Sequence, residues 1–360
     1  MSVAPTMKAL VFEGPGRLQL RDVARPTPAE GEVLVHVHRA TICGTDIRIV
    51  EGRKTRDIRY GYPIGHECAG TVAEVGPGVT GYAPGERVAV CVVVSCGECR
   101  DCRADRENLC AGRITLGYHT AGAFAEYMLI PAQAVRRGNL FKLPDEVGLE
   151  VAPLLEPMGC CVNGVHEMHP ERARPPASGR PSDADAASRS LAILGAGPIG
   201  LLHLKIARAY RRHERIVMTE PLPHRREAAL RFGADAALAP EAFEPAGTFD
   251  DVLVAFGDTS LVDVAMRAAG KCGRVSLFAG FDEEARVSFD PNLVHYQQLR
   301  LTGGSESRRR DYAEALALVR DGSLDLTGLV SHWFPLGTHE EAFRTATQRL
   351  GLKVGFQVAE

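Results

Sequence analysis

The chain has 360 residues, 45% hydrophobic and 24% charged, which is typical of a soluble globular protein with two domains. The formal net charge of −3 argues against nucleic acid or an anionic membrane as the main partner. No apolar run reaches the roughly 18 residues needed to cross a bilayer, and the N-terminus shows no apolar signal core. The clustered cysteines and the lack of an export signal predict a protein of the reducing cytoplasm.

Short β-strand patterns separated by glycine and proline fill the first part of the chain. Turn residues recur between the apolar runs, as at Gly14-Pro15-Gly16 and Gly76-Pro77-Gly78. Such spacing is typical of a β-barrel-like domain. The strands are predicted at Lys8–Phe12, Glu32–Ala40, Gly70–Val75, Arg87–Val94 and Ala123–Ile130.

Four cysteines fall close together on one short, glycine-containing loop. They are separated by two, two and seven residues: Cys96, Cys99, Cys102 and Cys110. Four thiolates can complete a tetrahedral shell around Zn²⁺, and metal binding would order a loop that has little apolar surface to bury. Two disulfides or a redox-active C-x-x-C pair are the alternatives. We predict zinc, and because a closed shell leaves no open position, we predict a structural role.

After about Gly148 the pattern changes to compact apolar strands that alternate with helices, which predicts βαβ units and a parallel sheet. The segment His169–Ser190 is rich in proline and has no periodicity, so we predict a surface loop there. The strands are predicted at Leu191–Leu194, Ile216–Thr219, Val252–Ala255, Arg274–Phe278 and Leu299–Thr302, with helices at Ile199–Tyr210, Arg225–Phe232 and Leu261–Ala269.

A glycine-rich turn between the first of these strands and its helix predicts a dinucleotide site. Gly195 permits the tight turn, Gly197 lets the backbone approach a pyrophosphate, and Gly200 lets the helix pack on the strand. The helix N-terminus then offers free N–H groups to the phosphates. Between the last two glycines lie Pro198 and Ile199.

An acidic residue at the end of the next strand supports this interpretation. Glu220 lies twenty positions after Gly200, where a carboxylate binds the adenosine ribose hydroxyls and repels a 2′-phosphate. We therefore predict NAD rather than NADP. Arg225 and Arg226 weaken the distinction, since a guanidinium can accommodate that phosphate. Arg225 could equally be a solvated helix charge.

A second set of metal-ligand types is spread over three segments. Cys43 is followed by Thr45, His66 by Glu67, and Glu156 lies near the start of the α/β half. A cysteine, a histidine and a carboxylate with one exchangeable position are what a catalytic zinc needs. Taken singly, each has an ordinary alternative: a buried thiol, a core histidine and a helix cap. Spacing alone does not join them.

Five motifs in this order resemble the zinc-containing medium-chain dehydrogenases, most of all the sorbitol and threonine dehydrogenase branch. A weaker similarity, through Glu220-Pro221, is to aminocyclitol dehydrogenases. The five motifs are Cys43-Gly-Thr-Asp46, Gly65-His66-Glu67, the four-cysteine loop, Leu155-Glu156-Pro157 and Gly195-Ala-Gly-Pro-Ile-Gly200.

The resemblance implies an α/β protein with two domains. A GroES-like β-barrel catalytic domain would comprise residues 1–160 and 305–360, with the zinc lobe near 96–110. A Rossmann domain with a doubly wound parallel sheet would comprise 161–304. The expected cofactors are NAD and two zinc ions per chain. The expected partners are a small-molecule alcohol or ketone and further copies of the chain, in a dimer or tetramer.

The resemblance also implies roles for the scattered residues. Cys43 and His66 would be zinc ligands, Glu67 a third ligand or its close neighbour, and Glu156 a ligand that exchanges with water or substrate. Thr45 would accept the substrate proton. The four cysteines of the loop would hold the structural zinc.

The chain departs from this branch at Arg48, where many members have a histidine that relays protons to solvent. A guanidinium stays protonated, so the relay must use another group or Arg48 must serve the substrate. We expect Arg48→His to change the pH–rate profile; an unaltered profile would place Arg48 outside the relay.

Polar residues near the expected metal favour a polyhydroxylated secondary alcohol over an aliphatic one. They are Thr45, Asp46, Arg48, Glu67, Tyr118 and His119, of which Tyr118 and His119 could simply be surface loop residues. An aminocyclitol is an alternative substrate. A non-catalytic zinc and dinucleotide scaffold is the alternative from another class, and the zinc-free quinone oxidoreductases are disfavoured because they lack these ligands.

Overall fold

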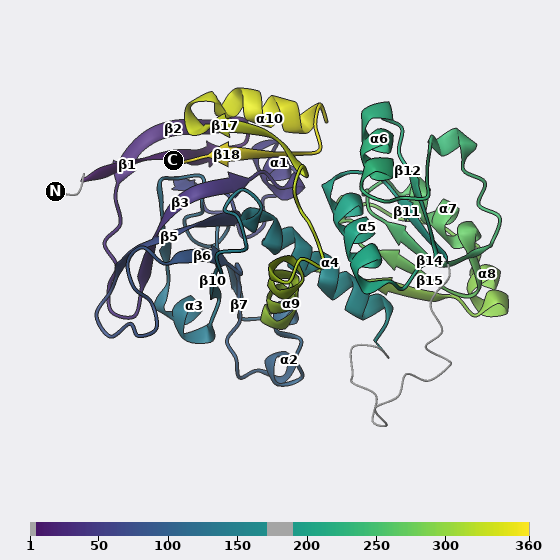
Figure 1. Cartoon of the computed structure of the whole chain (residues 1–360), viewed down its shortest axis with the longest axis horizontal. Coiled ribbons are helices and arrows are strands. Elements are labelled where there is room, and N and C mark those ends of the chain that lie inside the picture. The colour runs from purple at the N-terminus through teal and green to yellow at the C-terminus, as the bar shows by residue number, and fades with distance from the viewer. Residues whose placement is uncertain (1–4, 171–189, 360) are drawn as a thin grey trace. The chain divides into compact units, whose positions relative to one another are not determined.

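The computed structural model describes residues 5–170 and 190–359 and divides the chain into two compact units (Figure 1). The first comprises residues 1–159, 306–322 and 326–360, and the second comprises 160–305 and 323–325. Cys160 and Ser305, which the sequence analysis placed in the catalytic domain, thus belong to the second unit. Most of the predicted surface loop, residues 171–189, lies outside the described residues.

The first unit is built from mainly antiparallel sheets, with one parallel pair formed by the two C-terminal strands. One sheet has the order β2-β1-β4, and the main sheet has the order β10-β6-β5-β3-β18-β17, with β9 also paired to β3. Strand bounds are β1 Thr6–Gly14, β2 Arg17–Ala24, β3 Val33–Thr41, β4 Tyr62–Pro63, β5 Glu67–Val75, β6 Arg87–Val90, β9 Tyr127–Ile130, β10 Leu140–Lys142, β17 Val330–Pro335 and β18 Lys353–Gln357.

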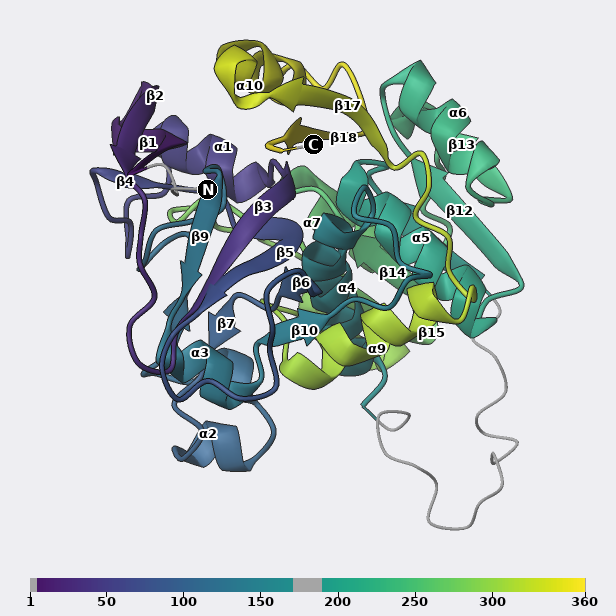
Figure 2. The ribbon, with the colours of Figure 1, turned by 60° about the vertical axis from the view of Figure 1, so that its left-hand side comes forward.

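The C-terminal segment returns to this unit. Strand β18 pairs antiparallel with β3, so that Gly355 lies opposite Thr41, and Thr41 lies opposite Glu67 on β5. Helix α10 (His339–Thr347) packs along β17 and β18 (Figure 2). This register brings a residue from the end of the chain, Lys353, toward the N-terminal motifs.

Two strand predictions in this unit need correction. The predicted strand Arg87–Val94 is interrupted after Val90, and Val93–Val94 (β7) pairs instead with Ile114–Thr115 (β8) in a separate two-stranded sheet. This break turns the chain toward the four-cysteine loop. Strand β9 begins at Tyr127, later than predicted.

Besides α10, the α-helices that lie within the first unit are α1 Gly44–Val50, α2 Arg100–Arg103, α3 Ala132–Arg137 and α9 Arg309–Arg320. Helix α4 (Leu155–Met168) starts in the first unit, with Glu156 in its first turn.

The second unit is the predicted doubly wound sheet, with its six described strands all parallel in the order β13-β12-β11-β14-β15-β16. Because the order reverses beside β11, right-handed connections place α5 and α6 on one face and α7 and α8 on the other (Figure 1). The strands are β11 Ser190–Leu194, β12 Arg215–Thr219, β13 Ala236–Leu238, β14 Phe249–Val254, β15 Ala269–Leu277 and β16 Arg300–Gly303. The helices are α5 Pro198–Tyr210, α6 Pro223–Arg231, α7 Ser260–Ala268 and α8 Pro291–Gln297. Across the described residues, every helix is too short or too polar to cross a membrane.

Candidate metal and dinucleotide sites

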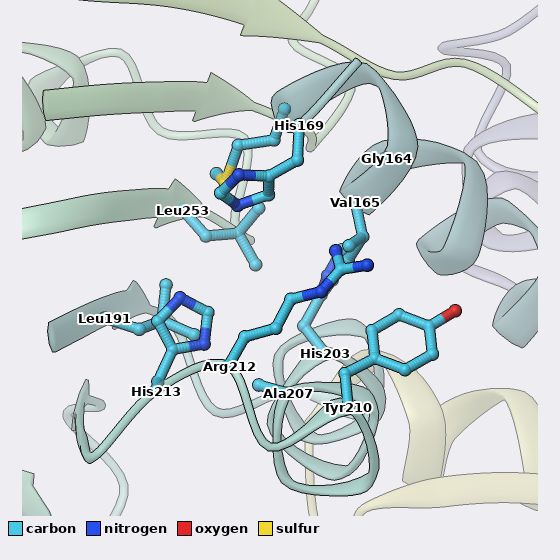
Figure 3. A pocket seen from close by; sticks show the side chains of 11 residues that line it. Gly164, Val165, His169, Leu191, His203, Ala207, Tyr210, Arg212, His213 and Leu253 are labelled. Atoms are coloured by element: carbon cyan, nitrogen blue, oxygen red, sulfur yellow. The ribbon is translucent and has the colours of Figure 1, made fainter. Parts of the chain in front are cut away.

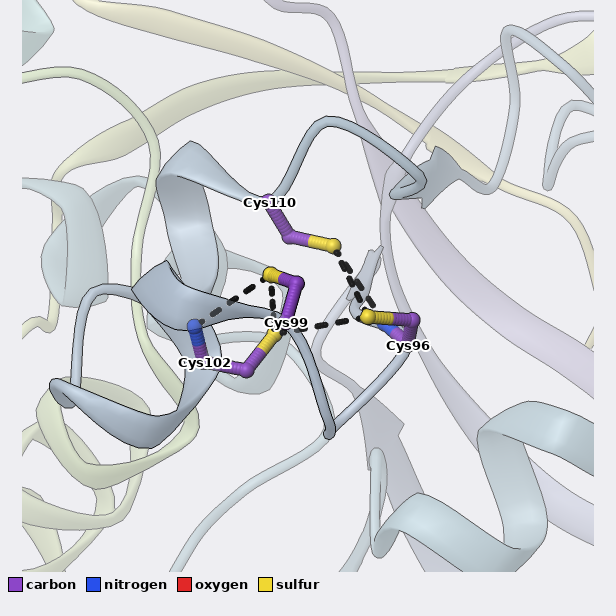
Figure 4. Close-up of side chains that lie close together, drawn as sticks. All are labelled: Cys96, Cys99, Cys102 and Cys110. Atoms are coloured by element: carbon purple, nitrogen blue, oxygen red, sulfur yellow. Dashed lines mark hydrogen bonds between the residues drawn. The ribbon is translucent and has the colours of Figure 1, made fainter.

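The four cysteines of the loop converge on one point (Figure 4). The sulfur atom of Cys96 lies 3.5 Å from that of Cys110 and 3.8 Å from that of Cys102, which lies 3.5 Å from that of Cys99. Zn–S bonds of about 2.3 Å in a tetrahedron put sulfur atoms about 3.8 Å apart, so the thiols fit a zinc ion. Backbone N–H groups of Glu98 and Cys99 lower the pKa of Cys96 to about 6, whereas burial raises the pKa of Cys110 to about 12, so a metal would displace a proton from Cys110 on binding.

A buried carboxylate anchors this lobe to the rest of the first unit. Glu107 follows the cysteine-bearing helix α2 and accepts hydrogen bonds from the backbone N–H and the guanidinium of Arg309. Arg137 lies 3.5 Å from the same carboxylate. The lobe is therefore fixed by charged contacts as well as by the sulfur cluster.

Three of the four residues predicted to bind a catalytic zinc also lie close together. Ligand atoms of Cys43, His66 and Glu67 lie within 4.8 Å of one another. Cys43 directly precedes α1, while His66 and Glu67 lie at the start of β5. Glu156 is buried at the start of α4 but lies outside this group of three as found among the described residues.

His66 is oriented by two neighbours. Its Nδ1 lies 3.2 Å from an oxygen of Asp46, and its Nε2 lies 3.3 Å from the Tyr118 hydroxyl. Burial disfavours protonation, but electrostatic interactions with Tyr118, Asp46 and Cys43 outweigh it and raise the pKa of His66 well above 6.5. A carboxylate beside Nδ1 directs Nε2 toward a metal, and binding would displace a proton.

Glu67 is held mainly by a residue that the sequence analysis missed. Lys353 Nζ lies 2.7 Å and 2.8 Å from the two carboxylate oxygens, and the Thr41 hydroxyl donates to the same carboxylate. Burial disfavours the ammonium, but the charge of Glu67 outweighs it and raises the pKa of Lys353. Only the pairing of β18 with β3 could have revealed this contact, because the two residues lie 286 positions apart.

Thr45 and Arg48 lie on the same short helix. The Arg48 Nη2 atom lies 3.5 Å from the Thr45 hydroxyl, and both side chains are half-buried. A guanidinium therefore lies beside the hydroxyl that the sequence analysis assigned to proton transfer. Asp46, the residue after Thr45, accepts a hydrogen bond from the Cys43 backbone N–H at 2.8 Å. This bond fixes the turn that carries the thiol.

The glycine-rich turn of the second unit has the geometry of a phosphate-binding turn. Gly195 has φ +111°, which only glycine adopts readily, and its N–H donates to Thr219. A Cβ on Gly200 would lie 2.0 Å from the carbonyl oxygen of Gly195. Close contact between helix α5 and the turn thus requires glycine, as the sequence predicts.

Glu220 lies directly after β12 and its carboxylate faces this turn. It accepts a hydrogen bond from the Ala196 N–H at 3.0 Å and another from the Leu222 N–H at 3.2 Å. The Arg225 side chain is buried, and its Nη1 lies 3.6 Å from the position that a Cβ on Gly197 would occupy. Both a carboxylate and a guanidinium therefore border the glycine turn.

Comparison with known families identifies both halves of the chain. Residues 29–145 match the alcohol dehydrogenase GroES-like domain, and residues 198–321 match the zinc-binding dehydrogenase domain.

Individual proteins are similar over nearly the whole chain. An L-threonine 3-dehydrogenase of Pyrococcus horikoshii is 33% identical over 354 residues, which is 94% of each chain. A zinc-binding dehydrogenase of Sinorhizobium meliloti bound to NADP has a TM-score of 0.86 at 27% identity, covering 98% of this chain and 99% of its own. An Escherichia coli alcohol dehydrogenase complexed with NADH has a TM-score of 0.85 at 25% identity, covering 98% and 99%.

Proposed function

This chain belongs to the zinc-binding medium-chain dehydrogenase family as an NAD(P)-dependent zinc alcohol dehydrogenase, and we propose that its substrate is a secondary alcohol of a polyol, sugar or cyclitol. Hydride would pass from the carbinol carbon to NAD and leave a ketone. The observation that carries the proposal is the polar set around Cys43 and His66. Within it, Arg48 lies 3.5 Å from Thr45 and the Tyr118 hydroxyl lies 3.3 Å from His66.

We propose that Cys43 and His66 hold a catalytic zinc. When bound, such an ion supplies Lewis-acid chemistry that lowers the pKa of a coordinated alcohol. Thr45 would then take part in removing the hydroxyl proton, passing its own proton on to solvent. Glu67, paired with Lys353, would be a close neighbour of the metal, and Glu156 would be the exchangeable ligand.

The four-cysteine lobe would hold a second, structural zinc. Its sulfur separations of 3.5–3.8 Å support this assignment, and four thiolates leave no position open for substrate. The catalytic and the structural site would therefore hold one zinc ion each.

Hydroxyl-rich substrates suit the donors in the first unit. The Arg48 guanidinium offers several N–H groups, and burial raises the pKa of Tyr118 well above 10, so its hydroxyl stays neutral and can donate. A simple aliphatic alcohol would leave these donors unpaired, which disfavours it.

L-Threonine is the second candidate, because several relatives at 32–33% identity are L-threonine 3-dehydrogenases. Threonine also carries a secondary alcohol, and its carboxylate could pair with Arg48. An aminocyclitol shares the secondary alcohol and the amine of threonine, but it has no carboxylate to pair with Arg48.

NAD is proposed as the cofactor because Glu220 presents a carboxylate at the end of β12. A carboxylate there binds ribose hydroxyls and repels a 2′-phosphate. The Arg225 side chain beside Gly197 supports NADP as the alternative.

A substrate panel tests the proposal. The zinc-loaded protein is incubated with cyclitols, aminocyclitols, linear polyols, L-threonine and 2-propanol, each with NAD or NADP, and reduced nicotinamide is followed by absorbance. Turnover of a cyclitol or polyol at least ~10-fold above L-threonine in kcat/KM, a difference of about 1.4 kcal/mol, is expected. Preference for L-threonine would replace the proposed substrate class, and no turnover with any alcohol would favour the scaffold interpretation.

A further inference from the structure

We propose that the second unit contains a third metal site, formed by His169, His213 and Asp251, which binds a divalent transition-metal ion such as Zn²⁺. The Nε2 atoms of His169 and His213 lie 3.1 Å and 2.8 Å from the same oxygen, Oδ2 of Asp251. Ligand atoms of the three residues lie within 4.8 Å of one another. None of the three belongs to the zinc or dinucleotide sites described above.

Three separate elements bring these side chains together. His169 follows helix α4, His213 lies between α5 and β12, and Asp251 lies on the central strand β14. Asp251 is fully buried, and the side chains of His169 and His213 are only 1% and 6% exposed. Placing a carboxylate and two imidazoles in the interior is costly unless they bind one another or a metal.

The spacing of the three side chains fits either a hydrogen-bonded network or a metal site, but the ligand types favour a metal. Zn–N and Zn–O bonds of about 2.0–2.2 Å in a tetrahedron put neighbouring ligand atoms about 3.4 Å apart. The observed separations of 2.8 Å and 3.1 Å need to widen by only a few tenths of an ångström to admit the ion. Two imidazoles and a carboxylate form a set that binds zinc, iron and similar ions.

The second carboxylate oxygen is already engaged. Oδ1 of Asp251 lies 3.7 Å from Nη1 of Arg274, while Oδ2 faces both imidazoles. Arg274 is thus an outer partner of the kind that orients metal-bound carboxylates.

A small cavity lies beside the cluster. It has a volume of about 20 Å³, and its lining includes His169, His203, His213, Tyr210 and Arg212. Figure 3 shows the imidazoles of His169 and His213 on the side away from Tyr210. The cavity lies on a side of the cluster from which a fourth ligand could reach a metal.

The competing explanation is a hydrogen-bonded His–Asp–His network without metal. The two differ in their response to added zinc. A metal site takes up an ion that a His213 variant cannot hold, whereas a network without metal leaves the zinc content of the wild type and of that variant equal.

Metal content of the full-length protein tests the proposal. The zinc-saturated protein is dialysed at pH 7.5, and bound zinc is measured by elemental mass spectrometry in the wild type and in the His213→Gln and Asp251→Asn variants. Wild type is expected to hold one more zinc per chain than either variant, which should bind this ion at least ~10-fold more weakly. His295→Gln, which changes an exposed histidine on α8, is the matched control and should keep the wild-type content.

Added zinc should also raise the melting temperature of the wild type and the control more than that of His213→Gln. Because Asp251→Asn alters a buried strand and could impair folding, the more exposed His213→Gln variant decides the result. Equal zinc content in wild type and His213→Gln would overturn the proposal and leave the hydrogen-bonded network as the explanation. The test measures a difference of one zinc ion per chain, so its outcome does not depend on the outcome of the substrate panel.

Discussion

Lys353 Nζ contacts both carboxylate oxygens of Glu67, at 2.7 Å and 2.8 Å, in the interior of the first unit. The pair joins the last strand, β18, to the start of β5, directly beside the ligand types Cys43 and His66. Because Lys353 and Thr41 already engage the carboxylate, Glu67 is stabilised as a charged neighbour of the proposed zinc. A negative charge there would offset part of the charge of a metal bound by one thiolate.

Lys353→Met should strongly destabilise the protein. The substitution leaves Glu67 as a buried, unpaired charge, which costs about 3–5 kcal/mol. Urea unfolding monitored by circular dichroism would measure this loss. Lys142→Met is the matched control, because Lys142 pairs with Glu86 at 2.6 Å but is 51% exposed, and solvent screens such a pair so that it adds little stability. Similar losses in the two variants would show that Glu67 does not depend on Lys353.

The double variant Lys353→Met with Glu67→Gln sharpens this test. Removing both charges should recover part of the lost stability, since the unpaired carboxylate is gone. If the double variant is less stable than Lys353→Met, packing rather than charge explains the effect.

Cys43→Ser should lower turnover, whereas Cys99→Ser should lower stability. Cys43→Ser removes a proposed ligand of the catalytic zinc, so turnover should fall by at least ~100-fold, about 2.7 kcal/mol, while the far-ultraviolet circular dichroism is unchanged. Cys99→Ser opens the four-sulfur shell, so unfolding should occur at a lower temperature. Cys272→Ser, which changes an exposed thiol, serves as the control for both. Full activity of Cys43→Ser would remove Cys43 from the proposed site.

Gly200→Ala should impair dinucleotide binding. The added Cβ would lie 2.0 Å from the carbonyl oxygen of Gly195, so helix α5 must move away from the turn that would bind the pyrophosphate. Overpacking of this kind costs about 1–3 kcal/mol, and the dissociation constant for NAD, measured by fluorescence titration, should rise at least ~10-fold. Gly337→Ala, at a position with no neighbour within 4 Å, should leave both quantities unchanged. An unaltered affinity would mean that the turn tolerates a side chain.

The architecture could be predicted from the sequence because its patterns are local. The apolar strands and helices after Gly148 alternate clearly, and the glycine turn at Gly195 carries its own conformational requirement. Strand β2 was missed because its residues alternate between charged and apolar types along an exposed edge, a weak pattern without a buried run.

The proposed catalytic set depended on contacts between distant segments. Cys43, His66 and Glu67 could be grouped only through family resemblance, because no spacing rule links them. Lys353 was not found at all, since a lysine on a C-terminal strand resembles any surface charge until the pairing of β18 with β3 is known. The cluster of His169, His213 and Asp251 was missed for the same reason.

His203 should make the second unit sensitive to acid. The side chain is buried and packs edge-on against Phe278, with ring centroids 4.5 Å apart, and burial lowers the pKa of His203 to about 3. In the unfolded chain the pKa is about 6.5, so the unfolded state binds more protons between these values. Stability from the neutral imidazole is therefore complete above pH 6.5 and is lost as pH falls toward 3.

The His203→Leu variant isolates this effect. Between pH 6.5 and pH 5 the wild type should lose about 2 kcal/mol more unfolding free energy than the variant, since one pKa unit corresponds to about 1.4 kcal/mol. Urea unfolding at a series of pH values measures the difference, and all other titrating groups are common to both proteins. His295→Leu, at an exposed position, should follow the wild type. Parallel pH dependence in the wild type and His203→Leu would show that His203 titrates normally in the folded protein.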